Sequence, residues 1–223
     1  LESNQPVISL AGLQRLINIE ALTKGQFKSL VLDITYDAQS GKAGMKQALD
    51  TLHDQAEKAV AEGYNILILS DRAVSATRIA IPALLACSAT HEFLVKAGLR
   101  TSTGLVIDTG SAREVHHFAL LAGYGAEAVC PWLVYETIHT LNTDAEKAGK
   151  NFVKAIGKGL YKVMSKMGIS TYQSYCGAQI FEAIGLNKEL IDKYFKGTAS
   201  NVGGIGIFEV AEEALKMHSL AFG

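Results

Sequence analysis

Cysteine is scarce in this chain, and its scarcity excludes two common ways of holding a fold together. The 223 residues include three cysteines, an odd number, at Cys87, Cys130 and Cys176, and none forms a CxxC pair. A disulfide framework uses cysteines in pairs, and a structural zinc site uses clustered thiolates or histidines, so we expect neither. The cysteine content instead favours a reducing compartment and no bound metal.

Long apolar runs, proline and net charge are also in short supply. No apolar run is long enough to cross a bilayer, and three prolines beside 48% hydrophobic residues argue against disorder. A formal net charge of −1 argues against a general nucleic-acid binder. The chain opens on Leu1 rather than methionine and without a charged-then-apolar leader, so we expect a fragment or a processed product. Because of the short apolar runs and the small net charge, we expect no membrane partner and no nucleic-acid partner.

Short β-rich runs and helical patterns alternate in the first part of the chain. The runs are mostly apolar without strict alternation, as expected for strands buried on both faces, and cover residues 29–35, 65–70, 103–109 and 126–130. Helical patterns separate them, including a nearly continuous apolar stretch at 81–97. This order predicts βαβ units, a parallel sheet and an α/β fold. Four strands are too few for a closed eight-stranded barrel, so we expect an open, half-barrel-like sheet of about four or five strands with flanking helices.

The pattern after Pro131 is mainly helical. We expect a C-terminal helical extension with helices at residues 133–141, 144–167, 178–185, 188–195 and 208–220, and residues 171–174 are a candidate for a fifth strand. No linker or repeat divides the chain, so we treat residues 1–223 as a single domain, with βα units in 1–131 and a mainly helical part in 132–223.

Three aspartates stand at the ends of predicted strands: Asp33, Asp71 and Asp108. Ligands bind at the carboxyl ends of strands in open α/β folds, so these residues could act as acid–base groups or metal ligands, although capping and turn roles are commoner. The sequence DTGS at 108–111 matches the aspartic-protease tetrapeptide, but that chemistry needs two carboxylates that share a proton. One copy between a strand and a helix is better interpreted as a turn, in which Gly110 supplies freedom and Ser111 caps the helix.

Two further motifs carry no catalytic signature. His116 and His117 are neighbours on a helix, where side chains point about 100° apart, so they cannot share a metal. The glycine-rich GGIG at residues 203–206 has neither the Walker A lysine pattern nor a GxGxxG context, so we interpret it as a flexible joint.

A lysine stripe and a polar turn are the candidate interaction surface. Lysines recur every fourth residue from Lys150 to Lys166, on a helix weakened by Gly157 and Gly159. This face could be solvated, or it could dock against another protein surface. Polar residues crowd the turn that follows. The interface candidates are Lys154, Lys158, Lys162, Thr171, Tyr172, Gln173, Ser174 and Gln179.

Several long segments resemble the central domain of the glutamate synthase large subunit. They include LSDR at 69–72, IPALLA at 81–86, AGLRT at 97–101, REVHHFA at 113–119, GYGA at 123–126, and residues 151–182 almost throughout. Even the opening LES is similar, so the resemblance covers essentially the whole chain. Small departures occur at Ser111, where an acidic residue is common, and at Trp132, which replaces a frequent tyrosine.

The resemblance implies a role inside a larger enzyme. In that family an amidotransferase domain hydrolyses glutamine, and ammonia passes through a tunnel to a flavin domain that makes glutamate from 2-oxoglutarate. The central domain joins the two and is credited with no catalytic, cofactor or metal residue. FMN and an iron–sulfur cluster then belong to the full-length enzyme, as do a small reductase subunit as partner and a cytoplasmic or plastid-stroma location. The alternative is a half-barrel with its own small anionic or flavin-phosphate ligand at Asp33, Asp71, Asp108 and the following helix N-termini.

Overall fold

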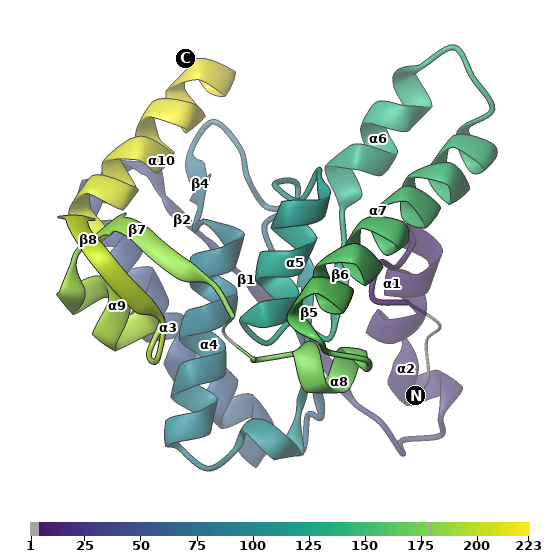
Figure 1. Cartoon of the computed structure of the whole chain (residues 1–223), viewed down its shortest axis with the longest axis horizontal. Coiled ribbons are helices and arrows are strands. Elements are labelled where there is room, and N and C mark those ends of the chain that lie inside the picture. The colour runs from purple at the N-terminus through teal and green to yellow at the C-terminus, as the bar shows by residue number, and fades with distance from the viewer. Residues whose placement is uncertain (1–4, 179) are drawn as a thin grey trace.

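The computed structural model (Figure 1) describes residues 5–178 and 180–223 of the protein. Its strands are β1 Ser29–Asp33, β2 Thr35–Asp37, β3 Ile66–Ser70, β4 Arg78–Ala80, β5 Gly104–Asp108, β6 Ala128–Cys130, β7 Glu182–Leu186 and β8 Ala199–Ile205. Its helices are α1 Leu10–Ile17, α2 Ile19–Leu22, α3 Gly41–Ala61, α4 Ala83–Lys96, α5 Val115–Gly123, α6 Trp132–Thr140, α7 Ala145–Met167, α8 Tyr172–Tyr175, α9 Lys188–Tyr194 and α10 Ile207–Phe222.

A parallel four-stranded sheet in the order β1-β3-β5-β6 forms the centre of the fold. All four strands were predicted, so the α/β half-barrel expectation is confirmed. The sheet is open, and the chain covers the outer edge of β6 with its own N-terminal segment. There the Ile8 N–H donates to the Val129 carbonyl at 2.9 Å, and the Val129 N–H donates to the Pro6 carbonyl at 2.8 Å.

Both faces of this sheet are buried, which explains why the strands lack polar alternation. Along β3, Leu67 and Leu69 belong to the larger apolar core with α3, α4 and α5. Ile66 and Ile68 belong to a second core with the α1 and α2 residues Leu13 and Ile19. The carboxyl ends of the strands are therefore held rigidly between two packed layers.

The long helix α7 begins and ends as its sequence predicts. The Asp144 side chain accepts a hydrogen bond from the Lys147 N–H, and Gly168 ends the helix in the left-handed conformation at φ 69°. Ile156, Leu160 and Met164 are its buried residues. Met167, in the last turn of the helix, is 50% exposed.

Glycine at position 159 allows α7 to pack closely on α5. A Cβ atom built on Gly159 would lie 2.2 Å and 2.7 Å from the two methyl carbons of Val115. Because carbon atoms normally pack 3.5–4.0 Å apart, this crossing of the two helices requires the glycine. Gly159, which lowers the helix propensity of α7, is thus required for close packing of the two helices.

One of the helices expected in the mainly helical second part was wrong. Residues 182–186 form strand β7 where a helix at 178–185 was predicted, and β7 pairs in parallel with β8. Gly185, at φ 81°, fits the irregular register of this pair, and the backbones approach closely, since a Cβ on Gly204 would lie 2.2 Å from the Gly185 carbonyl oxygen. Figure 1 shows this pair with α9 and α10 at the left of the molecule, beyond α3 and α4.

Three local expectations were also wrong. Residues 171–174, a candidate strand, are instead the N-cap and the first three residues of the short helix α8: the Thr171 side chain accepts a hydrogen bond from the Ser174 N–H and so starts a helical turn. The glycine-rich segment at 203–206 is not a joint, since Gly203 and Gly204 are part of β8. Ser111 does not cap α5 either: the capping position is Glu114, and the Ser111 hydroxyl lies 2.9 Å from that of Thr109.

Candidate functional site

The carboxyl edge of the parallel sheet brings together the aspartates that the sequence indicated. Asp33 ends β1, Asp108 ends β5, and Asp71 directly follows β3, which lies between those two strands. Ligands bind beyond this edge in open α/β sheets. The partners of each carboxylate therefore decide whether it is available to a ligand.

Asp71 is 5% exposed and fully engaged by the chain itself. Its carboxylate accepts hydrogen bonds from the Trp132 indole N–H at 2.6 Å, the Thr109 hydroxyl at 2.5 Å and the Gly110 backbone N–H at 3.0 Å. Burial raises the pKa of Asp71, and these three hydrogen bonds oppose the rise. Asp71 thus fastens the turn after β5 to the start of α6.

Asp108 is more deeply buried, at 1% exposure. Its Oδ2 atom accepts from the Ser70 hydroxyl and from Nε of Arg72, both at 2.7 Å. Among the described residues, its Oδ1 atom has no hydrogen-bond partner. Burial, and secondly the charge of Asp108, raise the pKa of the Cys130 thiol to about 12, so this thiol stays protonated at neutral pH.

The third carboxylate, Asp33, is half exposed and paired as well. It lies 2.9 Å from Nη2 of Arg78 and accepts the Thr35 backbone N–H at 2.8 Å. Arg78 also donates to the Thr35 hydroxyl and carbonyl. All three strand-end aspartates therefore have partners from the protein itself.

A hollow of about 290 Å³ lies beside this edge. Arg72 is the one cation among its lining residues, against the two carboxylates of Asp33 and Asp108, and the other lining residues are Ile17, Val31, Ile68, Ser70 and Ala73. Nε of Arg72 is already bound to Asp108. Because the lining carries more negative than positive groups, it disfavours an anionic ligand or a flavin phosphate.

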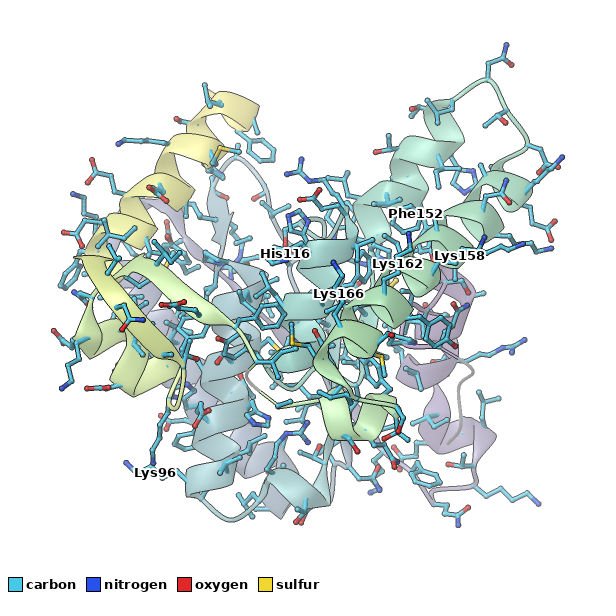
Figure 2. All side chains as sticks on the ribbon, in the orientation of Figure 1. Lys96, His116, Phe152, Lys158, Lys162 and Lys166 are labelled. Atoms are coloured by element: carbon cyan, nitrogen blue, oxygen red, sulfur yellow. The ribbon has the colours of Figure 1, made fainter. Side chains whose placement is uncertain are left out.

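The lysine stripe lies exposed along α7. Figure 2 shows Lys158, Lys162 and Lys166 following one another along this helix. Lys150 pairs with Glu146 at 2.5 Å. In the part of the chain that the structure describes, Lys154, Lys158 and Lys162 make no ion pair. Three positive charges are thus held on one rigid helix without counter-charges.

Side chains of the polar turn after α7 form more hydrogen bonds within the protein than the sequence indicates. The Tyr172 hydroxyl donates to the Ala126 carbonyl at 2.8 Å, and the Thr171 hydroxyl donates to that of Ser174 at 2.8 Å. The buried Tyr175 donates to the Ala119 carbonyl at 3.1 Å. Gln173 is exposed, and the predicted Gln179 lies outside the described residues. The tyrosines therefore anchor α8, and Thr171, Gln173 and Ser174 form its outer surface.

Residues 5–178 and 180–223 contain no candidate metal site. No group of three or more histidine, cysteine, aspartate or glutamate side chains there could hold a metal ion. His117 is partly buried and accepts the Arg113 N–H at 3.1 Å, whereas His116 is exposed and faces Phe181 edge-on (Figure 2). The two histidines have separate environments, as their adjacency predicted.

The residues that sequence reasoning missed here are Arg72, Arg78 and Trp132. Arg72 immediately follows Asp71, yet its partner is Asp108, 36 residues away. Trp132 is 61 residues from its partner Asp71. No local spacing links these pairs, although the position of Trp132 just after a strand and Pro131 is a weak signal for an edge residue.

A family model and curated relatives from different organisms each match this chain over most of its length. The family model described as the glutamate synthase central domain matches residues 1–187. The chain is 43% identical to the glutamate synthase [NADPH] large chain of Bacillus subtilis over 210 residues, with 92% of this chain and 14% of the relative covered. It is 42% identical to the chloroplastic ferredoxin-dependent glutamate synthase of Spinacia oleracea, with 97% and 14% covered.

A solved structure of a flavocytochrome b2 mutant with benzoylformate shares 14% identity at a TM-score of 0.49, covering 72% of this chain and 36% of that one. The curated relatives are far longer than this chain, which spans about one seventh of their length. The family model matches most of the chain, and the relatives align along nearly all of it. The chain belongs to the glutamate synthase family and contains its central domain.

Proposed function

We propose that this domain is a non-catalytic connector within a glutamate synthase large chain. In this proposal it joins the amidotransferase domain, which releases ammonia from glutamine, to the flavin domain, which forms glutamate from 2-oxoglutarate. It also helps to shape the path of ammonia between them. The small share of each relative that the chain spans supports a role as one part of a larger polypeptide.

The proposal rests on one observation: the carboxylates at the carboxyl edge of the sheet are bound by other groups of the protein. Asp71 fastens two segments of the chain, and Asp108 and Asp33 are each bound to an arginine. A catalytic carboxylate must be able to reach a substrate, and these are occupied in holding the edge together. The position that open α/β folds usually devote to a ligand is here devoted to structure.

The cofactors of the reaction then belong to other domains. In this proposal FMN and an iron–sulfur cluster belong to the full-length enzyme, whose partner is a small reductase subunit. The described residues do not fit such a cluster, which four thiolates typically hold. Cys87 and Cys130 are buried, and burial raises the pKa of both thiols, which keeps them protonated. A cytoplasmic or plastid-stroma location belongs to the same proposal. Within the described residues, no helix is long and apolar enough to span a membrane.

The lysine stripe and the outer surface of α8 form the proposed docking face of the connector. Unpaired positive charges along one helix complement an acidic surface and steer its approach. We assign Lys154, Lys158 and Lys162 of the stripe to this face, together with Thr171, Gln173 and Ser174 of the turn.

A thermal-shift screen of the isolated chain separates the connector from the ligand-binding alternative. The probes are FMN, inorganic phosphate and 2-oxoglutarate, each at millimolar concentration. The connector predicts no concentration-dependent rise in melting temperature with any of them. A saturable rise with one probe, abolished by Arg72→Ala, would establish a ligand site at the carboxyl edge instead.

A further inference from the structure

The central sheet has two edges, and the chain covers one of them. Residues 6–8 pair with β6, as described above, whereas β1 is the terminal strand on the other side. β1 is paired with β3 in continuous register, without a bulge. Natural proteins protect an open edge with lysine, proline or a bulge, because unpaired backbone groups attract further strands. Residues 29–33 contain no lysine and no proline, and their one charged residue, Asp33, stands at the end of the strand.

The hydrogen bonds at both ends of β1 show which backbone groups face outward. The Ile66 N–H donates to the Lys28 carbonyl, and the Ile34 N–H donates to the Ser70 carbonyl. Backbone groups of alternate residues in a strand face the same neighbour, so residues 28, 30, 32 and 34 face β3. The N–H and C=O groups of Val31 therefore point away from the sheet. Within the described residues no hydrogen bond reaches them, and Val31 is 44% exposed.

A groove runs along this edge, between β1 and α3. Its volume is about 640 Å³. Apolar side chains of both elements, including Leu30, Leu32, Ala48 and Ala59, line it together with polar residues such as Gln55 and Lys58. Five residues of strand span about 17 Å. The lining is mixed, since charged residues such as Glu62 and Arg78 also belong to it. A groove of this length beside the outward backbone groups of Val31 fits an extended peptide segment.

We infer that the β1 edge receives an extended segment from the remainder of the glutamate synthase large chain, added to the sheet as a further strand. The segment would exchange hydrogen bonds with the backbone of Val31 and place alternate apolar side chains against α3. About six sevenths of a large chain lies outside the part that this domain spans, so such a segment is covalently available at high effective concentration. The inference rests on the proposed role as one domain of a larger chain.

Amide hydrogen exchange at single-residue resolution tests the inference directly. In the isolated chain, the Val31 amide should exchange rapidly while the neighbouring Leu32 amide, which faces β3, is protected. In the complete large chain, the Val31 amide should slow by at least about tenfold. Equal rapid exchange in both proteins would overturn the inference. Slow exchange in the isolated chain that depends on its concentration, with dimers in sedimentation, would assign the edge to a second copy and also overturn it.

A pair of variants adds a second readout. Val31→Pro removes the outward N–H without removing a bond to β3, and proline is tolerated at such edge positions; Val31→Thr keeps the N–H and the β-branch. In the complete large chain we expect Val31→Pro, but not Val31→Thr, to restore rapid exchange at the Asp33 amide. If Val31→Pro fails to fold, the wild-type comparison alone decides. Flavin binding by the isolated chain would defeat the connector proposal but leave these exchange rates unchanged, so the two failures are distinguishable.

Discussion

Replacing Gly159 by alanine should destabilise the protein, although alanine is the better helix former. The new Cβ would lie 2.2 Å and 2.7 Å from the methyl carbons of Val115, so α5 and α7 must separate or Val115 must leave its rotamer. Overpacking of this kind costs about 1–3 kcal/mol, and the gain in helix propensity returns about 1 kcal/mol. The net change in unfolding free energy is therefore a loss of up to about 2 kcal/mol.

Gly157 in the same helix supplies the matched control. Its nearest neighbour, Oε1 of Gln5, would lie 3.8 Å from the new Cβ, which is an ordinary contact. Gly157→Ala should therefore stabilise the protein by about 1 kcal/mol. The two variants then differ by about 1–3 kcal/mol, and each kcal/mol corresponds to about 2–4 °C in melting temperature for a chain of this size.

The assay is thermal and chemical denaturation of both single variants followed by circular dichroism. A third variant, Gly159→Ala combined with Val115→Ala, should recover part of the loss, because the smaller side chain makes room for the new methyl group. If Gly159→Ala proves as stable as Gly157→Ala, the close crossing of α5 and α7 is wrong, and with it the placement of the lysine stripe.

Two further predictions concern pH and the docking face. Burial and the charge of Arg100 lower the pKa of His91 from 6.5 to about 4, so unfolded His91 binds a proton more readily than folded His91 and stability is lost as pH falls from 6.5 toward 4. His91→Gln should lessen that loss between denaturation series at pH 7 and pH 5; an unchanged loss would contradict the assignment. Charge reversal of the stripe should make the complete large chain more sensitive to limited proteolysis at its domain junctions, whereas reversal of three exposed lysines elsewhere should not, and the isolated chain should melt as before in either case. The stripe substitutions are Lys154→Glu, Lys158→Glu and Lys162→Glu, and the controls are Lys24→Glu, Lys46→Glu and Lys96→Glu. Figure 2 labels Lys96, which lies away from Lys158 and Lys162.

The parallel sheet could be predicted from sequence because its signals are local. Each strand is a short apolar run, and helices such as α3 end near a glycine, with Gly63 at φ 87°. Strands β7 and β8 could not be predicted in the same way. Glycine is depleted in strands, yet Gly204 lies in β8 because its backbone approaches Gly185 too closely for any side chain. That requirement exists only once the two segments are paired.

The position of the strand-end aspartates could be predicted from the sequence, but the partners of their carboxylates could not. The strand-end pattern placed Asp71 and Asp108 at the correct edge of the sheet. Whether they serve chemistry or structure depends on Trp132 and Arg72, whose contacts form only through the fold. The polar turn shows the same limit, since Tyr172 is bound to a backbone carbonyl 46 residues away. From the sequence alone we treated these polar groups as available to a ligand or a partner. In the folded protein most of them are hydrogen-bonded to other parts of the chain.

The connector role is tested most directly by titrating the purified chain with FMN and recording the bound absorbance spectrum after removal of free flavin. The account predicts no retained flavin, because the carboxyl edge of the sheet is occupied by its own side chains and the lining of the adjacent hollow disfavours a phosphate. One equivalent of tightly held FMN with a flavin spectrum would contradict it.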